Sequence, residues 1–287
     1  MLIQAQFLSP GSGTLVPRTV RGALCWSAAV LGLFLTGVGP AVSAEWKVLA
    51  DDEWCDQSWR GAYCEVRELF LPARDLIRVD AAKNGGIEIR GWDEDNIRIL
   101  AKIQVHRDRR GDAKEVAEGI VVETDGVIEP EGPRHDSWGV SFRIYVPRQI
   151  NLDLRAYNGG LSIEGVHGEL EFETHNGGIR LVDAGGDVNG WTQNGGLRVE
   201  LSGATWDGEG LNLETNNGGV SIRVPEDYSA RLVTGTINGG LHVDRDFEIR
   251  RKGTKGRKRK RVRTTLGEGG PLIRVVTTNG GVELIAS

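Results

Sequence analysis

The sequence is poor in the side chains that most often build metal and catalytic centres. It has three cysteines and five histidines in 287 residues. No two histidines have the spacing His-x-x-x-His and no Cys-x-x-Cys pair occurs, so nothing in the chain indicates a zinc site. No Gly-x-Ser-x-Gly elbow is present, and no glycine-rich loop precedes a helix that could hold phosphate. We therefore expect no cofactor, no metal and no enzyme activity.

Long apolar runs are equally scarce. One run, from Ala23 to Leu35, follows Arg18 and Arg21, and residues 42–44 (Val-Ser-Ala) form a small-residue cleavage pattern. This predicts a signal peptide over residues 1–44, because the run is short for a membrane span and has a cleavage site behind it. The alternative is an uncleaved membrane anchor. With cleavage after Ala44, the mature protein is expected to be exported and to have no transmembrane span.

Export changes what the cysteines can do. Cys25 leaves with the signal peptide, and Cys55 and Cys64 remain as a matched pair in an oxidising compartment. We predict a disulfide between them. It would close a short loop and contribute about 2–3 kcal/mol, mainly by restricting the unfolded chain.

Charge is unevenly spread. The chain has a net charge of −5, and loss of the two signal-peptide arginines takes it to −7. One tract, residues 250–263, holds ten cations and no acid, so the rest of the mature chain carries −17. Such a tract would attract polyanions with salt-dependent affinity, although a solvated loop explains it equally well. Its candidate polyanion-binding residues are Arg250, Arg251, Lys252, Lys255, Arg257, Lys258, Arg259, Lys260, Arg261 and Arg263.

Glycine, in contrast, is abundant, and much of it falls in one motif. The tripeptide Asn-Gly-Gly occurs seven times, always with an aliphatic residue three and five positions after the Asn and a small residue two positions before it. Such repetition at fixed offsets indicates a fold built from repeats. The copies begin at Asn84, Asn158, Asn176, Asn194, Asn217, Asn238 and Asn279.

The flanks of the motif predict a corner. Apolar or small residues lie six, four and two positions before most of the asparagines, and then three and five positions after them. A straight strand cannot change its inward parity in this way, because its side chains alternate strictly. We expect Asn-Gly-Gly to turn the chain, with glycine chosen because it tolerates positive φ and Asn because it tolerates the left-handed region.

Two all-β architectures satisfy this pattern. The favoured one is a repeat β-solenoid with short strands, in which Thr meets Thr and the asparagines form a hydrogen-bonded ladder along the stack. Its second corners would fall at residues 165–168 and 185–187. The alternative is an antiparallel β meander or sandwich, with Asn-Gly at the centre of hairpin turns. The repeat domain covers residues 76–287, with the basic tract as an insertion that projects from a corner.

The remaining segments are less regular. Residues 45–75, which include the cysteine pair, are expected to form a cap over the first repeat. Alternating side chains predict a strand over residues 97–105, and further strands over residues 120–122 and 140–146. Residues 112–118 predict a short helix, and residues 129–137, rich in Pro and Gly, predict a loop.

Two other clusters have weaker chemical meaning. Asp183, Asp187 and Asn189 alternate in a Gly-rich stretch that has a faint calcium-loop character, but an ordinary polar turn accounts for it better. The carboxylates of Glu169, Glu171 and Glu173 share one strand face, as the acid and base groups of a polysaccharide-cleaving enzyme would. A solvated outer face is the simpler interpretation.

The repeat frame, the signal peptide and the segment Ile87–Asp93 (IEIRGWD) after the first motif resemble the bacterial "putative adhesin" domain family of unknown function. The resemblance covers residues 76–287. It implies a β-solenoid-like fold and brings no catalytic residues.

From these observations we predict an exported bacterial protein of the periplasm, cell surface or medium. It would be a non-enzymatic, adhesin-like scaffold or binding module. An envelope polysaccharide enzyme and a periplasmic sensor or regulatory partner are the alternatives. The expected partners are an anionic envelope polymer, a lipid or another envelope protein, and export argues against nucleic acid.

Overall fold

The computed structural model of the chain describes residues 45–49, 53–55, 62–107, 110–134, 137–244 and 260–287. These belong to one compact unit, Ser43–Ser287. The predicted signal peptide and most of the basic tract lie outside the described residues. Within them the chain is all-β, with a single short helix, α1 (Arg110–Glu118).

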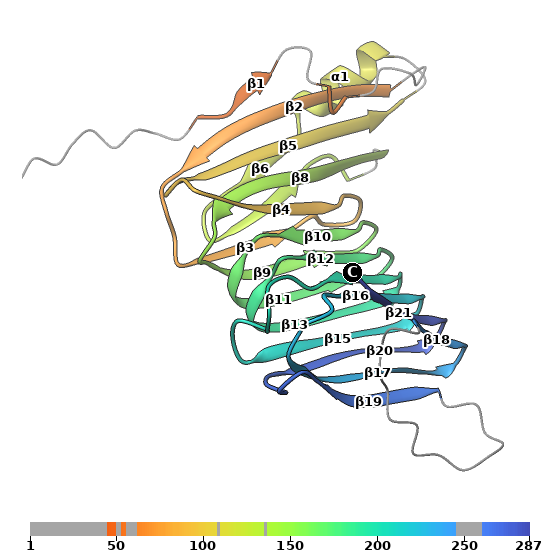
Figure 1. Cartoon of the computed structure of the whole chain (residues 1–287). Helices are drawn as coiled ribbons and strands as arrows, with labels where there is room; N and C mark the ends of the chain where they lie inside the picture. The colour runs from red at the N-terminus through yellow and green to blue at the C-terminus, as the bar shows by residue number, and fades with distance from the viewer. Residues whose placement is uncertain (1–44, 50–52, 56–61, 108–109, 135–136, 245–259) are drawn as a thin grey trace, which may run out of the picture. The chain divides into compact units, whose positions relative to one another are not determined.

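The strands form two large mixed sheets (Figure 1). The eleven-stranded sheet has the order β1 (Lys47–Leu49), β2 (Ala62–Leu71), β5 (Ile97–His106), β8 (Ser137–Pro147), β4 (Ile87–Trp92), β10 (Leu161–Glu164), β12 (Ile179–Val182), β14 (Leu197–Glu200), β16 (Val220–Val224), β21 (Val282–Ala286) and β18 (Leu241–Val243). The ten-stranded sheet has the order β19 (Arg261–Leu266), β17 (Ala230–Asn238), β20 (Leu272–Asn279), β15 (Gly210–Asn217), β13 (Gly185–Asn194), β11 (His167–Thr174), β9 (Asn151–Ala156), β3 (Leu76–Asp80), β7 (Val127–Glu131) and β6 (Val121–Glu123).

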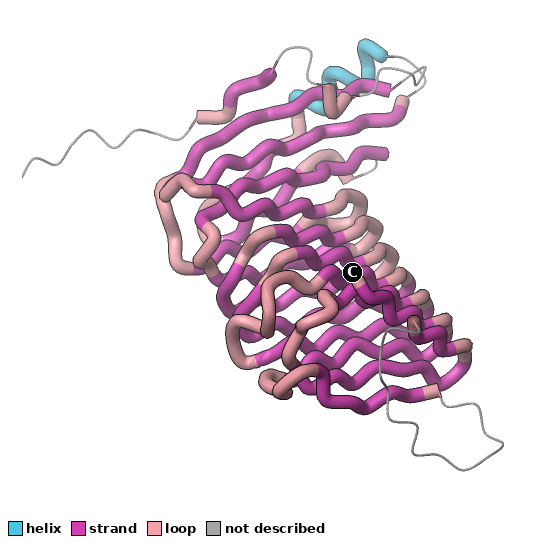
Figure 2. The backbone as a smooth tube through the Cα atoms, viewed as in Figure 1, coloured by secondary structure: helices cyan, strands magenta, loops and turns pink. Residues whose placement is uncertain are grey.

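Each Asn-Gly-Gly motif carries the chain from the ten-stranded sheet to the eleven-stranded one. The flanking strands are β3 and β4, β9 and β10, β11 and β12, β13 and β14, β15 and β16, β17 and β18, and β20 and β21. Figure 2 shows the resulting row of short loops. The two strands beside a motif therefore do not pair with each other, and the hairpin interpretation of Asn-Gly is wrong.

Neighbouring copies pair in parallel and in the register that the sequence predicts. Leu161 lies opposite Ile179, which in turn lies opposite Leu197. Antiparallel pairs occur toward the ends of the sheets, between β1, β2, β5 and β8, between β6 and β7, and between β17 and β19. The inward side chains of both sheets form one apolar core, as in a sandwich.

The parity change across the motif is visible in burial. Leu152 and Leu154 before Asn158 are buried, and so are Leu161 and Ile163 after it. Burying a side chain of this size stabilises the fold by about 1.5–3 kcal/mol. The repeated pattern therefore supplies a large share of the apolar core, and strands such as β5 and β8 supply much of the rest.

Buried threonines and exposed asparagines connect the copies. The hydroxyl of Thr192, fully buried, donates to the Gly177 carbonyl at 2.8 Å, and Thr174, Thr215 and Thr277 make the equivalent bond. The asparagine amides form the expected ladder, in which every member except Asn84 donates Nδ2 to the Oδ1 of a neighbour at 2.8–3.1 Å. Asn84, at the end of the ladder, donates to the Trp138 carbonyl. The order of the ladder is Asn84, Asn158, Asn176, Asn194, Asn217, Asn279, Asn238.

The corner glycines are required for a reason other than the predicted one. Six of the seven first glycines do not have a positive φ. The seventh, Gly280, has a φ of 159°, which is close to extended backbone. Instead, a Cβ on any of these first glycines would lie 1.8–2.0 Å from a backbone carbonyl oxygen of the adjacent strand. Positive φ occurs at the opposite corners, at Gly165 (67°), Asp183 (48°) and Gly186 (103°).

The last copy of the repeat is out of sequence order. Strands β20 and β21 lie between β15–β16 and β17–β18, so the seventh copy separates the fifth from the sixth. The chain reaches this position after forming β19, an antiparallel edge strand on β17.

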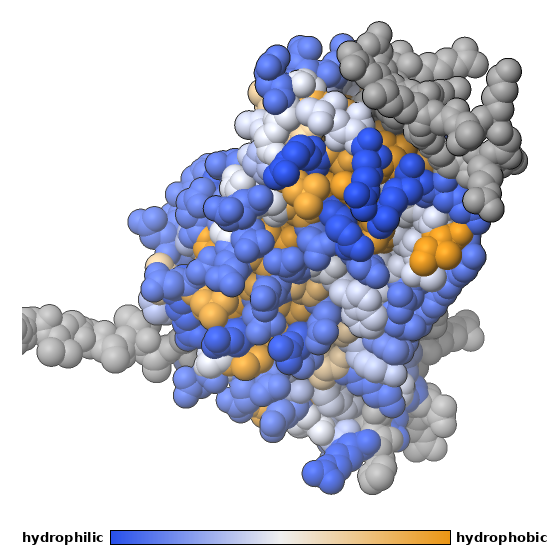
Figure 3. All heavy atoms as spheres, turned by 90° about the horizontal axis from the view of Figure 1, so that it is seen from below, coloured by the Kyte–Doolittle hydropathy of each residue, from blue (hydrophilic) through white to orange (hydrophobic). Residues whose placement is uncertain are grey.

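Arg261 and Arg263 belong to β19, and this part of the tract is therefore not a projecting loop as predicted. Figure 3, seen from below the view of Figure 1, shows mainly hydrophilic atoms with hydrophobic ones between them.

Strands β2, β5 and β8 and the helix α1 build the other end of the sheets. Arg67 on β2 donates to the carbonyls of Ala117 (2.8 Å) and Ile120 (2.6 Å), at and just beyond the helix C-terminus. Arg67 also pairs with Glu65 at 2.6 Å, and Glu65 accepts a hydrogen bond from Tyr63. Burial, and then the hydrogen bond to Glu65, raise the pKa of Tyr63 to about 12.

Two local predictions for this end need correction. The helix begins at Arg110, two residues earlier than expected, so Asp112 lies in its first turn. Residues 129–131, predicted to be loop, belong to β7. Pro130 lies opposite Val122 in the pair of β7 with β6, whereas β7 pairs with β3 only through Val127 and Ile128, before the proline. The β3 side of Pro130 therefore needs no donor.

Candidate functional site: a groove beside the glycine corners

A groove of about 890 Å³ runs across the outer side of the eleven-stranded sheet, over β12, β14, β16, β21 and β18. Each strand contributes the same three positions: the second glycine of the motif and the two residues after it. The second glycines are exposed and offer bare backbone to the groove. They are Gly178, Gly196, Gly219, Gly281 and Gly240.

These second glycines are under weaker steric constraint than the first ones. A Cβ would lie 3.2 Å from the nearest backbone oxygen at Gly196 and 3.6 Å at Gly219, and would meet no described atom within 4 Å at Gly240. Packing inside the protein therefore constrains this residue less than the first glycine, and least at Gly219 and Gly240. The sequence showed the repeat of glycine but not that its two members differ in this way.

Two arginines, from β12 and β14, line one end of the groove. Arg180 pairs with Glu200 at 3.3 Å and with Glu164 at 3.9 Å. Arg198 is exposed and has no carboxylate within 4.0 Å among the described residues. At the far end lie His242 and Glu283, opposite each other on β18 and β21. The groove thus offers positive charge toward its β12 and β14 end, mainly through Arg198.

The basic tract begins seven residues after Val243, the last residue of β18. Seven of its ten cations, those from Arg250 to Arg259, lie outside the described residues. Of the other three, Lys260 donates to the Ile237 carbonyl at 2.7 Å, and Arg261 and Arg263 lie on β19. Whether the tract binds polyanions remains a prediction.

The weaker clusters of the sequence do not form a built site in the described residues. Glu169, Glu171 and Glu173 are exposed along one face of β11. Asp187 and Asn189 lie on β13 and bond to each other at 3.2 Å, whereas Asp183 lies in the turn before it and accepts a hydrogen bond from Ser202. Within the described ranges no three His, Cys, Asp or Glu side chains gather as metal ligands would.

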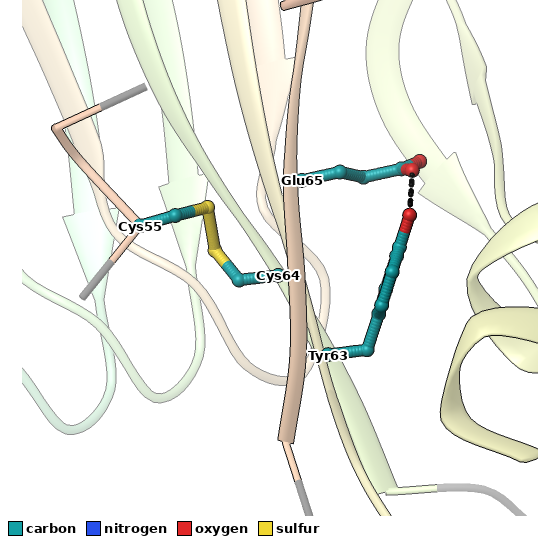
Figure 4. The surroundings of a disulfide bond; sticks show 4 residues. All are labelled: Cys55, Tyr63, Cys64 and Glu65. Atoms are coloured by element: carbon teal, nitrogen blue, oxygen red, sulfur yellow. Dashed lines mark hydrogen bonds between the residues drawn. A yellow bond between two sulfur atoms is a disulfide. The ribbon is translucent and has the colours of Figure 1, made fainter. Parts of the chain in front are cut away.

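The disulfide between Cys55 and Cys64 is present, with Cα atoms 5.7 Å apart (Figure 4). Cys64 points to one side of β2, and Tyr63 and Glu65 point to the other. The bond places Trp54 over two cations, with Lys102 Nζ 4.8 Å and Arg143 Cζ 4.4 Å from the ring centre. Burial, and then the charge of Arg143, lower the pKa of Lys102.

Arg143 also belongs to an ion-pair cluster on the same face. It donates to Glu88 at 2.8 Å, and Arg90 donates to the other oxygen of Glu88 at 2.6 Å. Burial acts against the charged form of Glu88, but these two hydrogen bonds outweigh it and hold its pKa below the ordinary value. The cluster therefore keeps Arg143 in place beneath Trp54.

Reduction of the disulfide is expected to lower the free energy of unfolding by about 2 kcal/mol, because the unfolded chain gains freedom and Trp54 is released from its cations. Urea unfolding with and without dithiothreitol measures the loss. The Cys55→Ser/Cys64→Ser double variant is the control, and its stability should not respond to the reductant. Equal stability of the oxidised and reduced wild type would contradict the prediction.

Among known proteins, the chain matches solved structures. No protein-family model matches the chain, and no protein of curated function matches it. Matching solved structures include a "putative cell adhesion protein" from Clostridium sporogenes (12% identity, 77% of this chain and 100% of that one, TM-score 0.38). A second is a "putative adhesin" from Bacteroides fragilis (9% identity, 77% of this chain and 97% of that one, TM-score 0.40). A third is a "putative lipid binding protein" from Parabacteroides distasonis (10% identity, 77% of this chain and 96% of that one, TM-score 0.31). At these TM-scores the matches do not establish a shared fold, and at 9–12% identity they assign no function to this chain.

Among the described residues, no helix has the length and apolar character that a membrane crossing requires.

Proposed function

We propose that the protein is an exported, non-enzymatic binding module of the bacterial envelope that holds an anionic polymer along the groove. The observation that carries the proposal is the groove itself, which repeats the same bare glycine and neighbouring positions on five adjacent strands. A site that repeats along an axis suits a ligand that also repeats along an axis. Adjacent strands are about 4.8 Å apart, so an extended chain can contact each strand in turn.

The charge of the groove favours an anionic chain. Arg198 forms no ion pair with a described residue, and Arg180 lies opposite it on the adjacent strand and lines the same groove. The basic tract begins seven residues after Val243, so its cations are tethered close to the end of the groove in sequence.

The architecture that we propose for this role is a β-solenoid whose two walls are the two sheets. The parallel register, the Asn ladder and the buried Thr bonds support it. Such a stack gives a rigid, extended surface. In this proposal residues 1–44 are the signal peptide, residues 45–75 cap the stack, and residues 76–287 form the binding domain.

The test is binding of the full chain to polygalacturonate and to phosphatidylglycerol vesicles at low and at physiological salt. The Arg180→Ser/Arg198→Ser variant should bind the polymer about tenfold more weakly, since two exposed charge contacts together contribute about 1–2 kcal/mol. Replacing the seven tract cations from Arg250 to Arg259 by serine should reduce the salt dependence of binding.

The matched control is Arg155→Ser, which removes an exposed arginine from the other sheet and should leave polymer binding unchanged. Equal binding by the wild type and the Arg180→Ser/Arg198→Ser variant would exclude the groove as the site. Binding to the vesicles alone would replace the polymer by a lipid headgroup as the partner.

A further inference from the structure

A second hollow, of about 340 Å³, lies on the outer face of the ten-stranded sheet over β9, β11, β13 and β15. Its central feature is Trp191 on β13, which is 37% exposed although it lies in the middle of the sheet. Packing within the protein does not require an aromatic side chain there, because the equivalent positions on the adjacent strands are occupied by Glu173 and Glu214.

The polar neighbours of Trp191 are arranged in two rows along the stack. One row runs through Arg155, Glu173, Trp191 and Glu214, which lie opposite one another on four successive strands. The second row, two residues earlier on each strand, runs through Asp153, Glu171, Asn189 and Asn212. The rows thus place an indole ring among carboxylate, amide and guanidinium groups.

Some of these polar groups remain open to a ligand. Glu171 is exposed and makes no ion pair with the described residues. Arg155 lies 3.8 Å from Glu173 and 3.5 Å from Asp153, both long for ion pairs, and its side chain is 60% exposed. Glu214 is held by Arg274 at 3.1 Å, which fixes the rim beside the indole.

This chemistry matches a saccharide. The C–H face of a sugar ring packs on the electron-rich face of an indole, while its hydroxyls donate to carboxylates and accept from amides. Four carboxylates around the hollow disfavour a polyanion, so the ligand differs from the one proposed for the groove. The strand spacing of about 4.8 Å is also close to the advance of one sugar unit along an extended β-linked chain.

We infer that the Trp191 hollow is a separate binding site for an uncharged, extended, β-linked saccharide chain that lies across β9, β11, β13 and β15. Trp191 stacks on one sugar ring. Glu171, Glu173 and Asn212 bind hydroxyl groups on either side of it. The site holds the chain without cleaving it, and its affinity is insensitive to salt because the ligand carries no charge.

Calorimetric titration of the full chain with cellohexaose tests the inference. The wild type should bind it equally at low and at physiological salt. Trp191→Ala should weaken binding at least tenfold, Trp191→Phe should retain part of it, and Glu171→Gln should weaken it a few-fold. Maltohexaose, whose α-linked chain is curved, should bind more weakly than cellohexaose.

Tyr157→Ala is the matched control, since Tyr157 is 50% exposed but stacks on His175 away from the hollow. It should bind cellohexaose as the wild type does, and thermal unfolding should show that all variants are folded. Absence of wild-type binding, or equal binding by Trp191→Ala, would overturn the inference, and equal binding of maltohexaose would overturn its extended-chain part. The Arg180→Ser/Arg198→Ser variant should keep full cellohexaose affinity, so this site and the groove can fail independently.

Discussion

Replacing Gly195 by alanine is expected to lower the free energy of unfolding by about 3 kcal/mol. The new Cβ would lie 2.0 Å from the carbonyl oxygen of Gly177 and 2.3 Å from its carbonyl carbon. Both are backbone atoms of the adjacent copy, so no side chain can rotate to make room. The same Gly177 oxygen accepts the hydroxyl of Thr192, and moving it would also disturb that buried hydrogen bond.

Gly240→Ala provides the control for this prediction. Gly240 is the second glycine of its motif, and a Cβ there would meet no described atom within 4 Å. The free energy of unfolding of Gly240→Ala should therefore differ from that of the wild type by less than about 0.5 kcal/mol, or rise slightly because alanine restricts the unfolded chain. Urea unfolding of both variants measures the difference. Similar losses at the two positions would show that backbone flexibility, and not close approach of adjacent copies, accounts for the motif.

Replacing Arg67 by methionine is expected to cost about 3 kcal/mol. The guanidinium satisfies the carbonyls of Ala117 and Ile120 behind α1, and it neutralises Glu65, whose side chain is only 10% exposed. Methionine would keep much of the apolar volume, but it would leave the Ile120 carbonyl without its donor and the carboxylate without its cation. The Ala117 carbonyl would keep only its backbone hydrogen bond from Ile120. Urea unfolding gives the total loss, and amide hydrogen exchange shows whether α1 opens first.

Two variants separate the parts of this effect. Glu65→Gln together with Arg67→Met removes the isolated charge, so the double variant should be more stable than the additive expectation from the two single variants. Arg78→Met removes a half-exposed arginine 3.8 Å from Asp153 and should change stability by less than about 0.5 kcal/mol. Unchanged hydrogen exchange in α1 after Arg67→Met would contradict the proposed capping role.

Repetition is what made much of this fold predictable. The inward positions around Asn158 follow from the change of parity across a strand pair, and the same offsets recur in the other copies. The contact of Asn with Asn and Leu161 with Ile179 follows from stacking like on like. The strand β5 and the helix α1 were predictable as well, because each has its own local period.

Features that depend on residues far apart in sequence were not predictable in this way. The order of the copies is an example, because β20 and β21 resemble the other repeats in every local respect, yet they lie between the fifth and sixth copies. The hollow around Trp191 is another. A single tryptophan at an outward position has no local signal, and only the pairing of β11, β13 and β15 surrounds it with Glu173 and Glu214.

The sequence by itself determined that the chain is all-β, that Asn-Gly-Gly is a corner and which side chains face inward, since these follow from periodicity within and between repeats. The tertiary structure alone decided why the corners contain glycine. The sequence predicted positive φ, whereas the structure shows a backbone of the adjacent copy too close for any Cβ. It also separated the two glycines of the motif, since the first is fixed by that contact and the second lies exposed along the groove.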